Sequence, residues 1–211
     1  MGDIRDLRIF FIGEPNVGKT CIIERFTGKK FEANSEPTIG VSHYGIKAGV
    51  KNGHEITLDL WDVSGQERFK EIIKIYFKGA HGCFFVYDIT NRDSFEKINE
   101  WFDRIHKEVG DIPIILVGNK SDLEEERQVS TEEGMNLAKE KNVKYFETSA
   151  KDNININAIF KAMSENILGE GFYEKLRDLP TSNDEFDEEG KKKEKKRKKR
   201  SHNADYHCYH T

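Results

Sequence analysis

Apolar residues gather along this chain in short continuous runs. They stand at 7–12 (LRIFFI), 83–89 (CFFVYDI), 112–118 (IPIILVG) and 143–146 (VKYF). Continuous runs of this length are typical of strands that are covered on both faces, as in a parallel sheet. Two further strands are predicted around 43–50 and 55–61, because they flank Asn52-Gly53, a strong hairpin turn signal.

Between the runs, apolar residues recur at steps of three and four, which predicts helices that bury one face. The spacing appears in Phe95, Ile98, Phe102, Ile105 and Val109, and again in Ile156, Phe160, Met163 and Ile167. A capping box at Ser130 to Glu133 predicts a helix over 131–141. Alternating strands and helices predict an α/β fold with a doubly wound sheet, whose ligands bind beyond the carboxyl ends of the strands.

The helical pattern ends at Leu168, and the charge distribution changes after it. The 211-residue chain carries a formal net charge of −4, although residues 191–200 (KKKEKKRKKR) hold nine basic residues and one acidic residue. We therefore predict one domain over 1–169 and a disordered tail over 170–211. A strongly acidic body argues against a nucleic-acid-binding domain. Cys21, Cys83 and Cys208 form no disulfide framework, which suits a reducing compartment.

Residues 13–20, GEPNVGKT, match the pattern G-x-x-x-x-G-K-[ST] between a predicted strand and a predicted helix. Gly13 and Gly18 would let backbone N–H groups point at phosphate oxygens, and the helix N-terminus would add a favourable dipole. Lys19 would meet the β- and γ-phosphates, and Thr20 would offer an oxygen to Mg²⁺. The alternative is an ordinary glycine-containing turn.

Residues 119–122, NKSD, follow the strand at 112–118 and indicate the base. The carboxylate of Asp122 would accept two hydrogen bonds from the N1–H and exocyclic amine of guanine. Adenine offers no such pair of donors, and a mismatch of this kind rejects an analogue strongly. Read alone, NKSD is also compatible with a surface turn.

With these motifs in place, the chain resembles the Ras superfamily of small GTPases over roughly residues 7–168. The resemblance rests on GEPNVGKT at 13–20, PTIG at 37–40, WDVSGQERF at 61–69, NKSD at 119–122 and TSAKDN at 148–153. It is most specific to the Rab branch, whose WDTAGQERF, YYRGA and VYDIT correspond to WDVSGQERF, YFKGA and VYDIT here. The implied fold is a P-loop NTPase-type six-stranded sheet, mostly parallel, with one antiparallel edge hairpin strand and helices on both faces.

The resemblance also implies roles for individual residues. Gln66 would orient the attacking water, Lys19 and Thr38 would act with it in catalysis, and Thr20, Thr38 and Asp62 would hold Mg²⁺. GTP or GDP would contact Gly13, Asn16, Val17, Gly18, Lys19, Thr20, Cys21, Phe31, Thr38, Gly65, Asn119, Lys120, Asp122, Ser149, Ala150 and Lys151. Pro15 and Asn16 depart from the small residues usual in this loop, and 41–43 (VSH) depart from the usual VDF.

The implied function is a monomeric switch that binds and slowly hydrolyses GTP in vesicle or membrane traffic. It would work with an exchange factor, a GTPase-activating protein and effectors that read the segments around 31–45 and 63–78. Since Pro15 has a fixed φ and no N–H, a guanine-nucleotide-binding scaffold with little hydrolysis remains an alternative. A P-loop kinase or ATPase is disfavoured by Asp122.

Cys208 is the fourth residue from the end, in the position of a prenylated cysteine. One lipid chain together with the basic run would bind the cytoplasmic face of an internal membrane or of the plasma membrane. Alternatives for the tail are a solvated charge run, a nuclear localisation signal, or a metal site at His207, Cys208 and His210. No apolar run approaches the ~20 residues that a membrane span needs.

Overall fold

The structure, a computed structural model, describes residues 6–33, 37–51, 54–65 and 77–169. Within them a six-stranded sheet forms the centre, in the order β2-β3-β1-β4-β5-β6. The strands are β1 (Asp6–Ile12), β2 (Val41–Lys51), β3 (His54–Val63), β4 (Gly82–Asp88), β5 (Ile114–Asn119) and β6 (Lys144–Thr148). β2 is antiparallel to β3, and all other neighbours are parallel. The predicted fold class is therefore confirmed.

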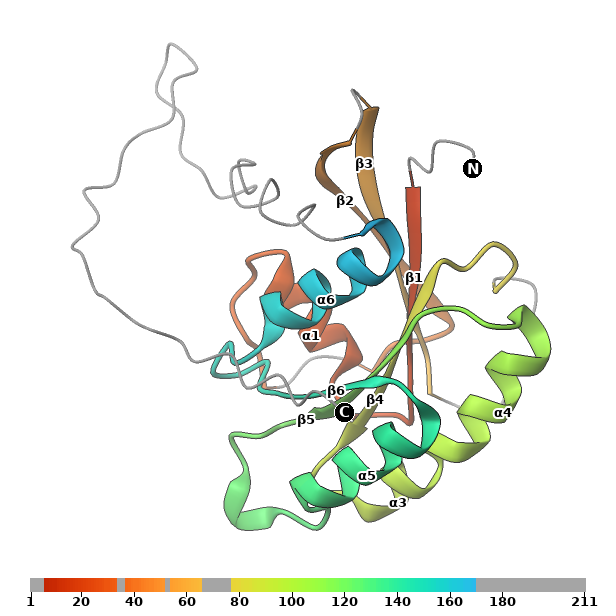
Figure 1. Cartoon of the computed structure of the whole chain (residues 1–211). Helices are drawn as coiled ribbons and strands as arrows, with labels where there is room; N and C mark the ends of the chain where they lie inside the picture. The colour runs from red at the N-terminus through yellow and green to blue at the C-terminus, as the bar shows by residue number, and fades with distance from the viewer. Residues whose placement is uncertain (1–5, 34–36, 52–53, 66–76, 170–211) are drawn as a thin grey trace, which may run out of the picture.

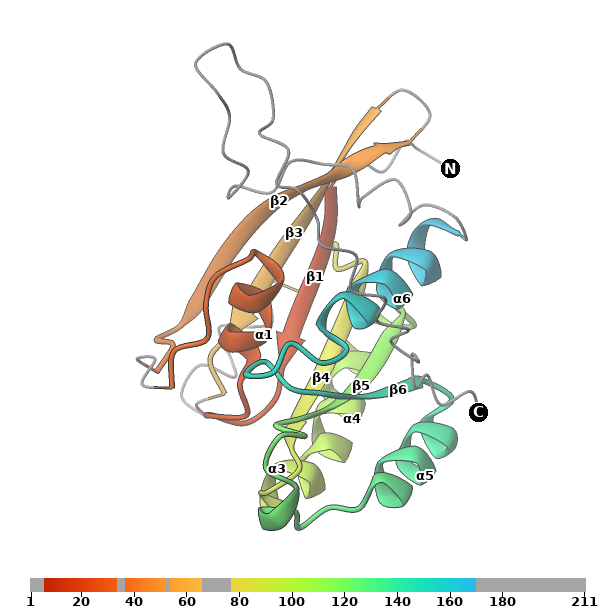
Figure 2. The same cartoon turned by 90° about the vertical axis from the view of Figure 1, so that its left-hand side faces the viewer.

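Helices cover both faces of the sheet (Figures 1 and 2). They are α1 (Lys19–Phe26), α3 (Arg92–Glu96), α4 (Ile98–Val109), α5 (Thr131–Lys141) and α6 (Ile156–Leu168), with a short 3₁₀ turn, η2 (Glu124–Glu126). Figure 1 shows α1 and α6 on one side of the sheet and α3, α4 and α5 on the other. This three-layer arrangement buries the sheet on both faces.

Successive residues of β1 point to opposite faces and enter two different cores. Ile9 and Phe11 pack in the core that includes Ile22 of α1 and Phe160 of α6. Phe10 and Ile12 pack in the second core, which includes Ile98, Trp101, Leu137 and Ala138 from α4 and α5. Each fully buried apolar side chain of this size contributes about 1.5–3 kcal/mol. The continuous apolar run of the sequence is thus explained by burial on both sides.

Several boundaries differ from the sequence-based expectation. β5 begins at Ile114 rather than 112, because Pro113 has no N–H to donate to the sheet. The helical spacing over 95–109 belongs to two helices, which meet at Lys97. Near this break the Ser94 hydroxyl donates to the Asn91 carbonyl at 2.7 Å, competing with the helical backbone bonds. The capping box of α5 is present as predicted.

The predicted hairpin joins β2 and β3, which pair from Val41 with Val63 to Lys51 with His54. Its turn, Asn52-Gly53, lies outside the described residues, as does the whole tail with its basic run and Cys208. Within the described ranges, no helix combines the length and the apolar character that a bilayer-spanning segment needs. The carboxyl ends of β1, β3, β4, β5 and β6 meet at one edge of the sheet, and the motifs follow them there.

Candidate functional site

The loop between β1 and α1 requires its two flanking glycines. Gly13 has φ +150°, and a Cβ there would lie 2.0 Å from the Val86 carbonyl oxygen. Gly18 has φ +94°, and its Cβ would lie 2.3 Å from Nδ2 of Asn119. Any larger residue would push the loop away from the neighbouring strands. The glycines therefore hold the loop against the ends of β4 and β5.

The two unusual loop residues fit the backbone that they occupy. Asn16 has φ +64°, in the left-handed region where asparagine is the best tolerated residue after glycine. Pro15 is exposed and lines the cavity described below. The departure from small residues thus leaves the bend of the loop intact.

Lys19 is the first residue of α1, and its ammonium lies inside the loop. It donates to the Gly13 carbonyl at 2.9 Å and to the Glu14 carbonyl at 2.8 Å. Burial lowers the pKa of Lys19 to about 8, and the negative charges of Asp62 and Glu14 oppose the decrease. A buried ammonium held by two carbonyl dipoles is suited to receive an anion.

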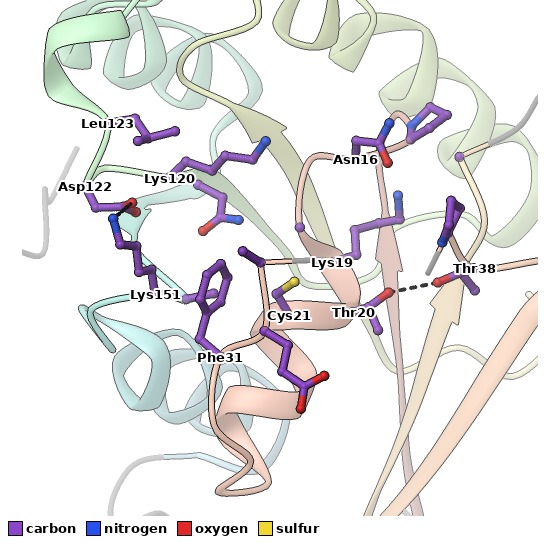
Figure 3. Close-up of a pocket in the computed structure, with 18 of the residues that line it drawn as sticks. Asn16, Lys19, Thr20, Cys21, Phe31, Thr38, Lys120, Asp122, Leu123 and Lys151 are labelled. Atoms are coloured by element: carbon purple, nitrogen blue, oxygen red, sulfur yellow. Dashed lines mark hydrogen bonds and ion pairs between the residues drawn. The ribbon is translucent and has the colours of Figure 1, made fainter. Parts of the chain in front are cut away.

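Three oxygen-bearing side chains converge beside Lys19 from separate elements. Thr20 of α1 donates to Oδ2 of Asp62 in β3 at 2.5 Å, and Thr38 donates to the same oxygen at 3.0 Å. The two threonine hydroxyls are 2.8 Å apart, as the dashed line in Figure 3 marks.

Asp62 is fully buried, and its Oδ1 has no hydrogen-bond partner among the residues that the structure describes. Burial raises the pKa of Asp62, which the Thr20 hydrogen bond and the Lys19 charge oppose. An unpartnered buried carboxylate oxygen beside two hydroxyls is a donor set that suits a hard cation such as Mg²⁺. The residues present therefore fit the metal that the sequence predicts.

Asn119, the last residue of β5, connects three segments. Its Nδ2 donates to the Val17 carbonyl of the loop at 2.8 Å, and its Oδ1 accepts from the Thr148 hydroxyl of β6 at 3.0 Å. The next residue, Lys120, has φ +69°, and its Nζ lies 2.5 Å from Oδ2 of Asp88 at the end of β4. These bonds fix the NKSD segment against the loop.

Asp122 is oriented by the segment that follows β6. Ser149 donates its hydroxyl to Oδ1 of Asp122 at 2.6 Å and accepts from the Asp152 N–H at 2.9 Å. The Lys151 ammonium lies 3.7 Å from Oδ2 of Asp122. The carboxylate is mostly buried and points into the cavity between these segments (Figure 3).

One cavity of about 510 Å³ joins these groups. Figure 3 shows Asp122, Leu123, Lys120 and Lys151 at one end, Asn16, Lys19, Thr20 and Thr38 at the other, and Phe31 and Cys21 between them. Of the residues predicted from sequence, the lining includes Asn16, Gly18, Lys19, Thr20, Cys21, Phe31, Thr38, Gly65, Asn119, Lys120, Asp122, Ala150 and Lys151. Gly13, Val17, Asp62 and Ser149 lie in the supporting shell.

Gly65 packs directly on the loop, since a Cβ there would lie 2.3 Å from the carbonyl carbon of Glu14 and the nitrogen of Pro15. Gln66, predicted as a catalytic residue, lies outside the described residues. Among the described residues, the chain from β3 therefore reaches the Lys19 end of the cavity at Gly65.

Three residues of this region were missed in the sequence. Asp88 pairs with Lys120. Thr148 anchors Asn119, and Glu14 supplies a carbonyl to Lys19. Asp88 and Thr148 are the last residues of β4 and β6, the two strands that flank β5, and this position at the carboxyl ends was the signal that could have found them.

Comparison with known proteins agrees with this geometry. The family model described as "Ras family" matches residues 8–169. The "Ras-related protein Rab-10" of Diplobatis ommata is 42% identical over 162 residues, covering 76% of this chain and 80% of that protein. The "Ras-related protein Rab-39A" of Mus musculus is 39% identical over 170 residues, with 78% of each chain covered.

A third relative, the "Ras-related protein Rab-2B" of Dictyostelium discoideum, is 41% identical over 162 residues, 76% of this chain and 80% of that protein. The family match spans the sheet from Arg8 of β1 onward and every motif that lines the cavity. The chain therefore belongs to the Ras family of small GTPases, in its Rab branch.

Proposed function

We propose that the chain binds GTP and GDP in this cavity and acts as a switch that hydrolyses GTP slowly. The observation that carries the proposal is the continuity of one 510 Å³ space from the Lys19 ammonium to the Asp122 carboxylate. One end has the chemistry of a polyphosphate site and the other has an oriented acceptor for a purine.

Guanine selection follows from the oriented carboxylate. Asp122 would accept from the N1–H and exocyclic amine, while Ser149 and Lys151 keep its two oxygens in place. The aromatic ring of Phe31 lines the same cavity and would pack against the base. Adenine would leave the buried carboxylate unsatisfied. The free-energy penalty of an unsatisfied buried acceptor is larger than the net stabilisation that one matched hydrogen bond provides.

Phosphate binding would use Lys19, the N–H groups of the loop and the N-terminus of α1. Thr20, Thr38 and Asp62 would hold Mg²⁺, which supplies positive charge to the phosphate oxygens when bound. In phosphoryl transfer the protein contributes mainly positioning and charge stabilisation. Lys19 contributes a charge, Gly65 contributes a backbone N–H, and Gln66 would orient the water.

Slow turnover makes the bound nucleotide a signal. We expect a GTPase-activating protein to raise the rate by about 10³–10⁵-fold by supplying an arginine that stabilises the charge of the transition state. An exchange factor would release GDP, and effectors would read the segments around 31–45 and 63–78. The Rab-branch relatives support a role in vesicle or membrane traffic.

A single-turnover assay tests the hydrolysis. Purified protein is loaded with γ-labelled GTP, and phosphate release is followed for the wild type and for Gln66→Ala. We expect slow release from the wild type and at least tenfold slower release from the variant. Stable GTP binding without any phosphate release would favour the scaffold alternative instead.

Membrane attachment through the tail has its own test. Cys208 would carry one prenyl chain, and the basic run at 191–200 would add attraction to an anionic leaflet. In eukaryotic cells, wild-type protein should partition into detergent, and Cys208→Ser should stay in the aqueous phase. Aqueous partitioning of both proteins would rule out the lipid anchor.

A further inference from the structure

Glu14, the second residue of the phosphate loop over 13–20, is a buried acidic residue. Its side chain is 11% exposed, and Oε2 accepts from the Lys97 ammonium at 3.1 Å. The other oxygen, Oε1, is buried without a hydrogen-bond partner in the described part of the chain. A negative charge is therefore held inside a loop whose neighbouring cavity has the chemistry of an anion site.

Glu14 is coupled to the groups around the phosphate end of the cavity in three ways. Its backbone carbonyl accepts from Nζ of Lys19 at 2.8 Å. Its carboxylate charge raises the pKa of Lys19 against the effect of burial. Its carbonyl carbon also supports Gly65, where a Cβ would stand only 2.3 Å away. A displacement of Glu14 would therefore change the positions of both Lys19 and Gly65.

Lys97 is fixed by its place in the fold. It lies at the junction of α3 and α4, 83 residues after Glu14 in the chain. Its backbone N–H donates to the Asp93 carbonyl at 3.2 Å, and the following residue, Ile98, is fully buried in the core. The ammonium thus reaches the loop from a packed helix junction, although the Lys97 side chain is 41% exposed.

We propose that Lys97 is a positioning residue for the phosphate loop, acting through Glu14. Its ammonium neutralises the Glu14 carboxylate and holds the peptide from Gly13 to Pro15 against Gly65. The proposal rests on nucleotide binding in this cavity, as proposed above. It assigns a residue outside every recognised motif to the control of nucleotide affinity.

The physical reason is the cost of an unpaired buried charge. Removing one partner of a buried ion pair leaves the other uncompensated, and the exposure of Lys97 moderates this cost without removing it. An uncompensated Glu14 would repel the phosphates directly. It would also turn toward water and shift the carbonyl that receives Lys19. Both effects weaken nucleotide binding, and both vanish when Glu14 carries no charge.

Lys97→Met removes the charge and keeps the length of the side chain. Dissociation of a fluorescent GDP analogue and of a GTP analogue is measured at fixed Mg²⁺ and salt. We expect about tenfold faster release from Lys97→Met, equivalent to about 1.4 kcal/mol of affinity. Release from Glu14→Gln/Lys97→Met should return to within about threefold of the wild type, and Lys97→Arg should behave likewise.

Lys107→Met is the matched control, because it removes the same charge from an exposed position in the last turn of α4. Its release rate should equal that of the wild type. Thermal unfolding is recorded for each variant, and Lys97→Gln replaces Lys97→Met if the latter does not fold.

Two results would overturn the inference. One is a wild-type release rate in Lys97→Met, and the other is a double variant as defective as the single one, which would indicate a structural role without charge compensation. Failure of the proposed function would give a different result, because the wild-type protein itself would then bind neither the GDP analogue nor the GTP analogue.

Discussion

The Ser149 hydroxyl donates to Oδ1 of Asp122 at 2.6 Å, although the two residues are 27 positions apart. They meet because β5 and β6 are neighbours in the sheet, and each residue follows the carboxyl end of its strand. The carboxylate is thus oriented by groups of the protein itself. Preorganisation of this kind is what allows one residue to select a base.

Asp122→Asn should change base preference. The amide has one acceptor fewer and adds a donor, so we expect about 100-fold weaker GDP binding. Binding of xanthosine diphosphate should strengthen, because its C2 carbonyl accepts from the new amide. Competition against a fluorescent nucleotide measures both. Ser149→Ala, which removes only the hydrogen bond that orients Asp122, should weaken GDP binding by about 3–10-fold. Unchanged guanine preference in Asp122→Asn would contradict the assignment of Asp122 as the guanine acceptor.

Nucleotide binding should weaken in mildly alkaline solution. Burial lowers the pKa of Lys19 to about 8. Phosphate favours the ammonium, so binding should raise this pKa and take up a proton. We therefore expect affinity to fall about fourfold between roughly pH 7 and pH 8.5. Calorimetry in buffers of different ionisation enthalpy counts the proton, and Lys19→Arg should abolish the slope. A wild-type affinity that does not change with pH would disprove proton uptake by Lys19.

The same shift predicts how stability changes without nucleotide. The folded-state pKa of Lys19 is below its usual value, so the unfolded chain binds more protons between pH 8 and the ordinary lysine range. This group's contribution to the free energy of unfolding should therefore rise with pH through that window. Denaturant titrations of nucleotide-free wild type and Lys19→Met check the sign, since the rise should be smaller in the variant.

Removal of Mg²⁺ should release nucleotide. Thr20, Thr38 and Asp62 offer oxygen atoms within hydrogen-bond distance of one another, and Oδ1 of Asp62 lacks a described partner. We expect a chelator to accelerate GDP release by about 10–100-fold in the wild type. Thr20→Ala should release GDP rapidly even with Mg²⁺ and respond little to chelation. Equal chelator effects in both proteins would argue against Thr20 as a ligand.

Gly134 of α5 should be intolerant of alanine. A Cβ there would lie 2.5 Å from the hydroxyl of Tyr145 and 2.7 Å from that of Tyr87. These hydroxyls are hydrogen-bonded to each other at 2.8 Å, so neither ring can move alone. We expect Gly134→Ala to lower the free energy of unfolding by about 1–3 kcal/mol.

The control for this variant is Gly45→Ala, where a Cβ would meet nothing within 4 Å. Tyr145→Phe should recover part of the loss in the Gly134→Ala background, because it removes the hydroxyl oxygen, one of the two Tyr145 atoms that would lie 2.5 Å from the new Cβ. Helix propensity alone predicts stabilisation by alanine. If denaturant titration shows equal or greater stability for Gly134→Ala, the two tyrosine rings can move to make room for the Cβ, which would contradict this prediction.

The sequence predicted what depends on local pattern. The loop glycines, Lys19 and the capping box of α5 are each defined by neighbours within a few residues. The pairing of Lys97 with Glu14 was not predictable in this way. It depends on the order of the strands and on the break between α3 and α4, which the regular apolar spacing over 95–109 conceals. The later start of β5 was readable from Pro113.

The same distinction holds within the site. Asp122 was identifiable from NKSD, whereas the contact of Asn119 with the Val17 carbonyl joins residues 102 positions apart. Motif recognition indicates which residues share a ligand. It does not indicate which of them support one another, because support is decided by three-dimensional packing.

The most direct test of the account is the identity of the nucleotide that accompanies the purified protein. The protein is denatured after purification in Mg²⁺, and the released nucleotide is identified by ion-pair chromatography and mass spectrometry. We expect GDP or GTP from the wild type, and a marked loss of this nucleotide from Asp122→Asn. Recovery of ADP or ATP in its place would contradict the account.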